Sequence, residues 1–380
     1  MTNIYLDHAA TTPVHPQVIE AMVPVYQEVF GNPSSVHQFG RKARRILDEA
    51  RRTMADSIHC NEKEVIFTGS GTEADNMAII GAARANREKG NHIITTAIEH
   101  HAVLHAAEQL KKEGFIVTYL EPDVNGRITA EDVADALTEE TIVVSVMMVN
   151  NETGVIQPIP EIGEIVSSHQ AYFHTDAVQA FGTMPIDVNE LQVDLLAVSA
   201  HKINGPKGVG FLYAKEGTIL ETLHHGGEQE RKRRPGTENL PGVKGFEAAV
   251  QMVMQEKEDR QDAYRLYKNI FLDILRKEEI EFSINGDPEK SVDTIINISF
   301  TGTNVEALLT NFDLAGVAAS SGSACTAGSV EPSHVLSAMY GSEDERVYNS
   351  IRFSFGLANN EANVKEAAEN VCKIVNRLKR

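Results

Sequence analysis

Residues 193–208 read VDLLAVSAHKINGPKG, and this stretch decides the fold. The apolar run 193–198 predicts a buried strand that ends at Ser199, and Gly205 and Pro206 then turn the chain. Lys202 lies between these two signals, so it can point into a cleft. A partly desolvated lysine loses its proton more easily, and its neutral amine can form a Schiff base. The alternative is a surface lysine that begins a loop, which for a single lysine is the commoner case.

The chain of 380 residues is long enough for about two domains and a large core. Its net charge of −19 argues against direct binding to nucleic acid or to an acidic membrane surface. No apolar run could span a bilayer, and the N-terminus has no signal sequence. Three scattered cysteines predict neither a disulfide framework nor a zinc site. These features are typical of a cytoplasmic protein.

Strands and helices alternate from residue 64 onwards. Strands are expected at 65–67, 92–96, 115–120, 141–149, 171–174, 193–199 and 209–213, and helices between several of them at 101–113, 130–137 and 159–169. This alternation predicts an α/β fold with a mostly parallel sheet covered by helices on both faces. In such sheets ligands bind beyond the carboxyl ends of the strands.

From about Asn239 the pattern changes to long helices that reach about residue 279. A smaller α+β region follows, with strands at 294–299 and 351–354 and a closing helix at 361–380. We expect a large domain at 13–257 and a small domain formed by 1–12 and 258–380. Arginines on the expected second helix (Arg41, Arg44, Arg45, Arg51 and Arg52) are interpreted as a solvated face. The basic run 231–234 is either a solvated loop or an anion contact.

Polar groups follow several of the predicted strands. Residues 68–73 (TGSGTE) join a strand to a helix and could bind an anion, although for this stretch alone an ordinary turn is the commoner case. Asp176 ends a buried strand, where it needs a cationic partner or caps a helix, and Gln179 follows it. His100 follows another strand and could stack on a ring or move a proton, or be structural. Residues 150–154 (NNETG) follow a fourth strand, so these groups should converge on one edge of the sheet.

Two further residues stand out in the second half of the chain. Cys325 lies in a run of small polar residues, 320–329 (SSGSACTAGS), where a structural cysteine is unusual. It is either a nucleophile or a chance cysteine in a solvent loop. Arg352 lies within a strand pattern, and could clamp a carboxylate or pair with a structural acid.

The chain resembles the pyridoxal-phosphate cysteine desulfurases of the NifS/IscS type. The likeness covers nearly the whole chain, and the residues that carry it are 6–13 (LDHAATTP), 31–35 (GNPSS), 71–73 (GTE), 99–100 (EH), 149–152 (VNNE), 176–179 (DAVQ), 199–202 (SAHK) and 321–325 (SGSAC). The last motif marks the branch with a long cysteine loop. The resemblance implies the aspartate-aminotransferase-like fold, fold type I of the pyridoxal-phosphate-dependent transferases.

The resemblance also implies roles for individual residues. Lys202 would carry pyridoxal 5′-phosphate as a Schiff base, and Asp176 would pair with the ring nitrogen. The phosphate would be bound by Gly71, Thr72, Ser199, His201 and, from the other subunit of a homodimer, Thr237. His100 would stack on the ring, Gln179 would bond its phenolic oxygen, and Asn151 would line its polar edge. Arg352 and Asn32 would bind the substrate carboxylate, with Asn151 beside them.

By the same resemblance the reaction is removal of sulfur from L-cysteine. Lys202, helped by His100, would remove the α-proton, and the thiolate of Cys325 would attack the substrate sulfur. L-Alanine would leave and a persulfide would remain on Cys325 for an acceptor protein, in tRNA thiolation or iron–sulfur cluster assembly. Relatives that serve iron–sulfur scaffolds often have a longer C-terminal tail, whereas this sequence stops at Arg380 after its last helix. This departure leaves room for a dedicated acceptor, such as a tRNA-thiolating enzyme.

Three other readings compete with this one. An aminotransferase or selenocysteine lyase has no need of a cysteine on a long Gly/Ser loop, so Cys325→Ser would leave it active. A non-catalytic partner protein with the same fold would not need the lysine, acid and cysteine together. A nucleotide-binding module is disfavoured because the phosphate loop lacks the expected lysine.

Overall fold

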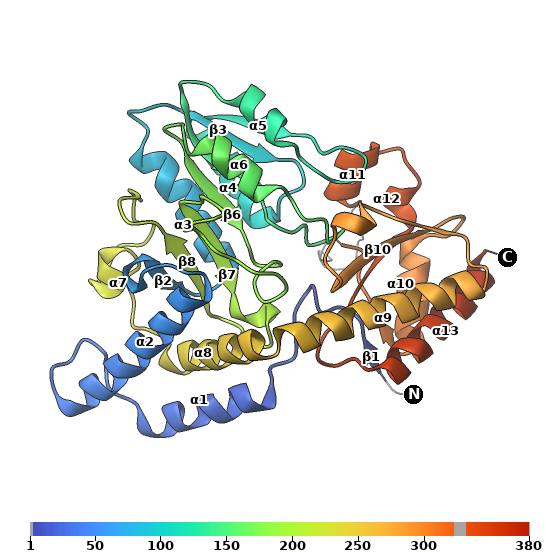
Figure 1. Cartoon of the computed structure of the whole chain (residues 1–380), viewed down its shortest axis with the longest axis horizontal. Coiled ribbons are helices and arrows are strands. Elements are labelled where there is room, and N and C mark those ends of the chain that lie inside the picture. Colours follow the sequence, from blue (N-terminus) through green and yellow to red (C-terminus); the bar gives the residue numbers. More distant parts are fainter. Residues whose placement is uncertain (1–2, 323–331, 380) are drawn as a thin grey trace.

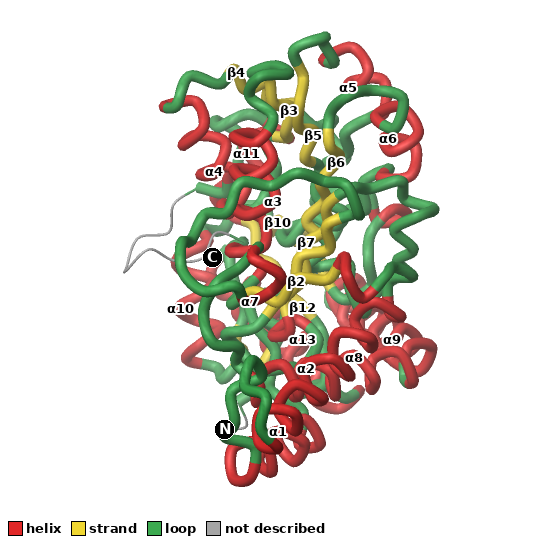
Figure 2. Tube along the Cα trace, turned by 90° about the vertical axis from the view of Figure 1, so that its left-hand side faces the viewer, coloured by secondary structure: helices red, strands yellow, loops and turns green. Residues whose placement is uncertain are grey.

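A seven-stranded sheet with helices on both faces forms the larger part of the molecule (Figure 1, Figure 2). The computed structural model describes residues 3–322 and 332–379. The strand order is β2–β8–β7–β6–β5–β3–β4. The strands are β2 (Val65–Thr68), β3 (His92–Thr96), β4 (Ile116–Leu120), β5 (Thr141–Ser145), β6 (Tyr172–Asp176), β7 (Leu195–Ser199) and β8 (Gly210–Ala214).

The sheet is mostly parallel, as expected, and β8 is the exception. It pairs antiparallel with both β2 and β7, while the other neighbours are parallel. Only the 3-10 turn Ala200–Lys202 lies in the connection from β7 to β8. This connection is too short for a crossover helix, so β8 has to return in the opposite direction.

Helices α3 (Gly71–Ala85) and α4 (His101–Lys112) cover one face of the sheet, and α5 (Ala130–Ala136) and α6 (Ile159–Val166) cover the other (Figure 2). Strand β7 contributes side chains to the cores on both faces of the sheet. Leu195 and Ala197 pack into the core under α3 and α4, whereas Leu196 and Val198 pack into the core on the opposite face. Successive side chains of a strand point to opposite faces, so a strand buried on both sides is apolar throughout.

The long helical region after Asn239 is two helices, α8 (Leu240–Gln255) and α9 (Lys257–Lys277), rather than a single one. Helix α8 packs against α1 (Pro16–Glu28) and α2 (Gln38–Ser57) below the large sheet (Figure 1). Phe246 of α8 belongs to the large core, whereas Phe271 of α9 belongs to a second core. The chain therefore passes from one core to the other at the break between the two helices.

The second core lies around a three-stranded antiparallel sheet of order β12–β10–β9. Its elements are β9 (Phe282–Ile284), β10 (Ile295–Phe300), α10 (Val305–Leu314), β12 (Ser350–Ser354) and α13 (Glu361–Leu378). The N-terminal strand β1 (Ile4–Tyr5) pairs in parallel with β11 (Val317–Ala318), and Leu6 is buried in this core. We propose on these grounds the domain division expected from the sequence, 13–257 against 1–12 with 258–380.

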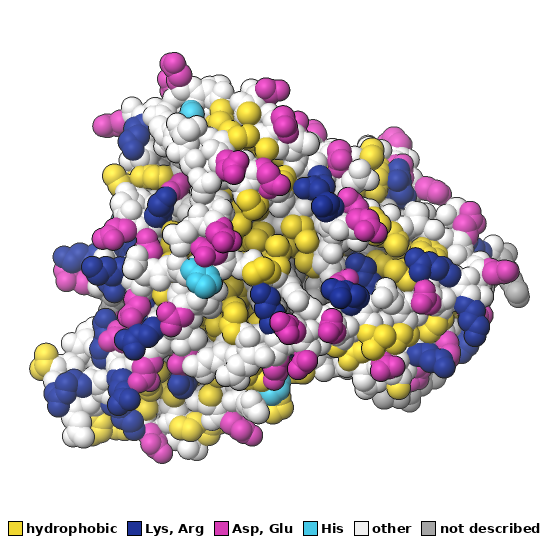
Figure 3. Space-filling view, viewed as in Figure 1, with side chains coloured by type: hydrophobic (Ala, Val, Ile, Leu, Met, Phe, Trp, Pro, Cys, Tyr) yellow, Lys and Arg dark blue, Asp and Glu magenta, His cyan; other side chains and the backbone are white. Residues whose placement is uncertain are grey.

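The remaining helices are short: α7 (Gln229–Lys232), α11 (His334–Tyr340) and α12 (Arg346–Asn349). Within residues 3–322 and 332–379, no helix has the length and apolarity that crossing a bilayer demands. On the face drawn in Figure 3, basic side chains are interspersed with acidic ones. The absence of direct nucleic-acid binding stays a prediction from the net charge.

Candidate active site

The carboxyl ends of neighbouring strands surround one pocket with about 1100 Å³ of empty space. Strand β3 leads to His100, β5 to the turn that contains Asn151, β6 ends at Asp176, and β7 leads to Lys202. Because β2 and β7 both run antiparallel to β8, β2 ends at the same edge and leads to Gly71. The topology therefore brings together the groups that follow the predicted strands.

Ten of the predicted site residues line this pocket: Gly71, Thr72, His100, Asn151, Asp176, Gln179, Ser199, His201, Lys202 and Arg352. Two others lie elsewhere in this chain. Asn32 accepts a hydrogen bond from the backbone of Ser34 in the loop before α2, and Thr237 lines a separate surface hollow beside Glu73. Cys325 lies outside the described residues. The roles assigned to these three residues stay predictions.

Lys202 is held at the pocket by the backbone of the N-terminal segment. Its Nζ donates hydrogen bonds to the carbonyl oxygens of Ala9 and of Ala10, the latter at 3.0 Å. Burial, together with the positive charge of Arg352, lowers the pKa of Lys202 to about 8. An amine with this pKa is largely neutral in mildly alkaline solution, which is the form that attacks a carbonyl group.

This pKa gives a direct expectation for the cofactor-free protein. Below pH 8 Lys202 is mostly protonated and unreactive, and above it mostly neutral, so its acetylation by acetic anhydride should rise through about pH 8. An unperturbed lysine, with a pKa of about 10.4, responds about two pH units later. Competitive labelling followed by peptide mass spectrometry measures this, with an added lysine-containing peptide as reference. A Lys202 that follows the profile of the free peptide would contradict the assignment.

Asp176 ends β6 and is buried beside a second carboxyl group, that of Asp75 on α3. Asp176 accepts a hydrogen bond from the backbone N–H of Val178 at 2.8 Å. Burial raises the pKa of both acids, and the charge of Asp176 raises that of Asp75 further. Oδ1 of Asp75 lies 3.4 Å from Nε2 of the buried His174. A single negative charge on this pair would suit a cationic ring nitrogen in the pocket.

Two histidines at the pocket are neutral. Nδ1 of His100 accepts a hydrogen bond from the backbone N–H of Ala102 at 3.1 Å, so the ring proton lies on Nε2. Nδ1 of His201 lies 3.1 Å from the hydroxyl of Thr11. Burial and then the charge of Lys202 lower the pKa of each histidine to about 4. Neutral rings can stack on a ligand without adding charge to the pocket.

The first turn of α3 lies at the edge of the pocket and can bind an anion. Ser70 caps the helix with its side chain, and Gly71 is the first helical residue. A Cβ on Gly71 would lie 2.7 Å from Cγ2 of Val178, so only glycine fits without a shift of that side chain. The unpaired N–H groups of a first turn bind anions, and Ser199 and Thr72 line the same place.

Arg352 reaches the pocket from β12 of the smaller sheet. Its buried guanidinium donates to the backbone oxygen of Asn151 at 2.9 Å and to Oδ1 of Asp7 at 3.0 Å. Its Nε has no hydrogen-bond partner in the part of the chain that the structure describes. A buried arginine with an open N–H group can bind a carboxylate.

The pocket also includes residues that the sequence does not single out, among them Asp75, Met147, Glu152 and His334. Asp75 had a signal, because it is an acid within the otherwise small and apolar stretch 74–83 of α3. Glu152 sits beside Asn151 in the quoted motif, but nothing in its spacing distinguished it from a surface acid. Met147 follows the run of β5 and gives no sequence signal of its own.

The donor set of the pocket fits pyridoxal phosphate, the cofactor that the resemblance implies. The first turn of α3 offers N–H groups to a phosphate, Asp176 offers an acid to a ring nitrogen, and Lys202 offers an amine to an aldehyde. Oδ1 of Asn151 is buried and, among the described residues, has no hydrogen-bond partner. Buried polar atoms are nearly always paired, so this atom indicates a polar ligand.

Comparisons with known proteins agree with this geometry. The family model described as "Aminotransferase class-V" matches residues 4–366. The "Putative cysteine desulfurase IscS 1" of Bacillus subtilis is 56% identical over 378 residues, covering all of both chains. The "Cysteine desulfurase IscS" of Methanosarcina thermophila is 45% identical over 377 residues, covering 99% of this chain and 93% of that one.

Solved structures show the same relationship. A "NIFS-LIKE PROTEIN" superposes with a TM-score of 0.93 at 32% identity, covering 99% of this chain and all of the other. The structure described as "SspA in complex with cysteine" has a TM-score of 0.83 at 36% identity and covers 93% of this chain and 98% of the other. The fold is thus fold type I of the pyridoxal-phosphate-dependent transferases. The chain belongs to the class-V aminotransferases and, within them, to the pyridoxal-phosphate-dependent cysteine desulfurases of the NifS/IscS type.

Proposed function

We propose that this enzyme removes sulfur from L-cysteine, releases L-alanine, and holds the sulfur as a persulfide on Cys325 for transfer to an acceptor protein. The observation that carries the proposal is the composition of one pocket. Lys202 with its lowered pKa, the buried Asp176 and Arg352 all line this pocket. Gly322, three residues before Cys325 in the sequence, lines the same pocket.

The residues that would hold the cofactor follow from their places in the pocket. Lys202 would bind it covalently, Asp176 would pair with its ring nitrogen, and further contacts would come from Gly71, Thr72, His100, Asn151, Gln179, Ser199 and His201. When bound, the cofactor supplies a conjugated ring that accepts the electron pair released at the substrate Cα.

Arg352 orients the substrate. Its buried guanidinium keeps the Nε–H group free for the carboxylate of L-cysteine. The hydrogen bonds to Asn151 and Asp7 fix the orientation of the guanidinium plane. Asn32 remains a predicted second contact to this carboxylate. Arg352 is on the smaller sheet, so substrate binding joins the two parts of the molecule.

Lys202 is the base that moves the α-proton. The pKa of about 8 leaves it both able to lose a proton and basic enough to accept one near neutral pH. His100 has its Nδ1 engaged by the backbone of Ala102, so it presents the Nε2 proton to the pocket. His100 therefore acts as a donor and a stacking surface, and Lys202 as the acceptor.

The sulfur step is balanced without any oxidant. The thiolate of Cys325 attacks the substrate sulfur, so an S–S bond forms and the substrate C–S bond breaks. The electron pair of the broken bond stays with the substrate carbon, which takes the proton that the thiol of Cys325 gave up. L-Cysteine and a thiol thus become L-alanine and a persulfide.

The enzyme is proposed to act as a homodimer in the cytoplasm. Thr237 lies apart from the pocket of its own chain, as a residue that reaches the partner's cofactor would. Large apolar side chains on α1, on the connection to α2 and in the first turn of α2 are exposed: Ile19, Val23, Tyr26, Phe30, Val36 and Phe39. An exposed apolar area of this kind is typical of an interface between copies. The acceptor is a tRNA-thiolating enzyme or an iron–sulfur scaffold, and sulfur delivery to both purified proteins would distinguish them.

The deciding experiment maps sulfur adducts by peptide mass spectrometry after brief exposure of the enzyme to L-cysteine without reductant. We expect one extra sulfur on the Cys325 peptide of the wild type. Burial raises the pKa of Cys60 to about 12 and of Cys372 to about 11, so these two thiols should stay unmodified. An unmodified Cys325 in protein that carries the cofactor would refute the proposal and leave the other pyridoxal-phosphate reactions.

A further inference from the structure

Glu152 is a buried acid in the turn between β5 and α6, and its backbone is fixed from two sides. Its N–H donates to Oδ1 of Asn150 at 2.9 Å, and its carbonyl oxygen accepts from Nδ2 of Asn297 at 3.2 Å. Only 1% of its surface is exposed. The carboxylate is therefore held in one place at the wall of the pocket.

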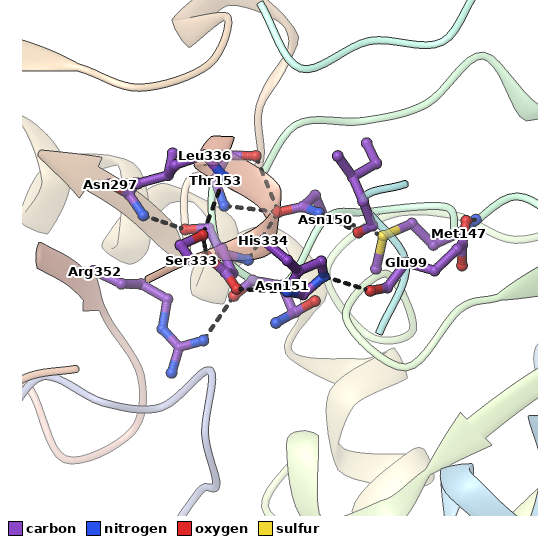
Figure 4. Close-up of polar contacts among 12 residues, drawn as sticks. Glu99, Met147, Asn150, Asn151, Thr153, Asn297, Ser333, His334, Leu336 and Arg352 are labelled. Atoms are coloured by element: carbon purple, nitrogen blue, oxygen red, sulfur yellow. Dashed lines mark hydrogen bonds and ion pairs between the residues drawn. The ribbon is translucent and has the colours of Figure 1, made fainter. Parts of the chain in front are cut away.

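The two ends of the segment 323–331 both meet this carboxylate. The hydroxyl of Ser333 donates a hydrogen bond to Oε2 of Glu152, and a Cβ on Gly322 would overlap the same oxygen. Nδ1 of His334 lies 4.0 Å from Oε1. Figure 4 shows Ser333 and His334 beside the turn that contains Asn151 and Thr153. A single side chain thus contacts described residues on both sides of the stretch that contains Cys325.

The contacts continue into the substrate side of the pocket. The backbones of Ser320 and Arg352 exchange two hydrogen bonds, at 3.2 and 2.7 Å, and the Arg352 guanidinium donates to the carbonyl of Asn151. Nε2 of His334 is 2.9 Å from the carbonyl oxygen of Glu99. Arg352, the ends of the segment and Glu152 therefore form one connected set of contacts.

A buried carboxylate has a large desolvation penalty, which a purely structural contact at this position would not require. Burial raises the pKa of Glu152, while the Ser333 hydrogen bond and the charge of Arg352 act in the opposite direction. An uncharged side chain could fill the same space without the desolvation cost of an acid. The arrangement of acid, hydroxyl and arginine around one segment indicates a role in the reaction.

We propose that Glu152 is a positioning residue that joins the two ends of the Cys325 segment at the pocket and so promotes the sulfur-transfer step. The inference rests on the proposed function, because it assigns the attacking thiol to Cys325. Cys325 follows Gly322 by three residues, so covalent geometry keeps the two Cα atoms within about 11 Å. Fixing Gly322 therefore limits the distance between the thiol and the substrate.

The test separates sulfur transfer from the chemistry at the substrate Cα. Wild type, Glu152→Ala and Glu152→Gln are compared in the rate of persulfide formation on Cys325, in the KM for L-cysteine, and in the exchange of the α-proton of L-alanine in D₂O. We expect Glu152→Ala to slow persulfide formation by about 10²-fold, as misplacement of a reacting group does, with KM and exchange changed less than about threefold. Glu152→Gln keeps a hydrogen-bond acceptor for Ser333, so its rate of persulfide formation should lie between those of the wild type and Glu152→Ala.

Glu64→Gln is the matched control, because Glu64 is also buried but accepts backbone hydrogen bonds from Asn61 and Glu216 far from the pocket. It should leave both rates unchanged. If Glu152→Ala folds poorly, Ser333→Ala, which removes the hydroxyl that donates to Oε2 of the same carboxylate, must show the same separation of the two rates. Equal losses of transfer and exchange, or no loss of transfer, overturn the proposal. A wild type without sulfur on Cys325 refutes the proposed function instead.

Discussion

Replacing Lys202 with alanine is expected to lower the rate of alanine release from L-cysteine by about 10³-fold or more. The variant loses the only amine that the described residues place in the pocket beside Asp176, and with it the base for the α-proton. The effect should appear in kcat, since Arg352 and the anion site of α3 remain to bind the ligands. Steady-state assay of alanine with saturating cofactor measures it.

Two controls make this result specific to the amine. Lys207 is exposed five residues further along the chain, and Lys207→Ala should keep the wild-type rate. Small primary amines added to Lys202→Ala should restore part of the rate in proportion to their neutral form. A Lys202→Ala enzyme that retains more than about a tenth of the activity would show that another group moves the proton.

The polar edge of the sheet could be predicted because each of its groups directly follows a buried strand. Asp176, Lys202 and Asn151 each stand at the end of an apolar run, and parallel strands end at a common edge. These strands can be recognised from the sequence because a strand that is buried on both faces is apolar throughout. A surface helix, in contrast, is apolar on one face only. The individual roles needed the resemblance, since a strand end alone does not distinguish a ligand from a cap.

Contacts between distant segments could not be predicted in the same way. Glu152 and Gly322 meet only because the smaller sheet packs against the turn after β5, and no local pattern encodes that contact. The break between α8 and α9 at Glu256 has no proline or glycine to announce it. Strand β8 is antiparallel because its connection to β7 is short. The apolar pattern identifies the strand but not its direction.

The expectation of a solvated face is wrong for Arg51. The sequence pattern groups this residue with Arg41, Arg44, Arg45 and Arg52 on the solvated face of α2, whereas the structure buries it. Its guanidinium forms a two-pronged ion pair with Glu230, with N–O distances of 2.7 and 2.6 Å. Helical spacing places residue 51 between the two faces, so its burial depends on the segment that crosses α2.

Removing one partner of this pair is expected to lower the free energy of unfolding by about 3–5 kcal/mol, because the other charge is left buried. In Arg51→Met, the Glu230 carboxylate keeps only the backbone N–H of Phe67, at 3.0 Å. Glu230 also begins a run of three residues with positive φ, which are disfavoured outside glycine and persist where packing fixes them. Urea unfolding of the cofactor-free protein at fixed concentration measures the loss.

The control and the double variant decide whether the loss comes from the buried charge. Arg45 pairs with Glu49 on the same helix but is exposed, so Arg45→Met should leave the urea midpoint almost unchanged. Arg51→Met combined with Glu230→Gln leaves no unpaired charge and should cost less than the sum of the two single changes. The double variant should not regain the full free energy of unfolding of the wild type, because Arg51 also donates a hydrogen bond to the backbone of Val65 at 2.8 Å. Additive losses would mean that the two side chains stabilise the fold independently, and that the left-handed run is held by other contacts.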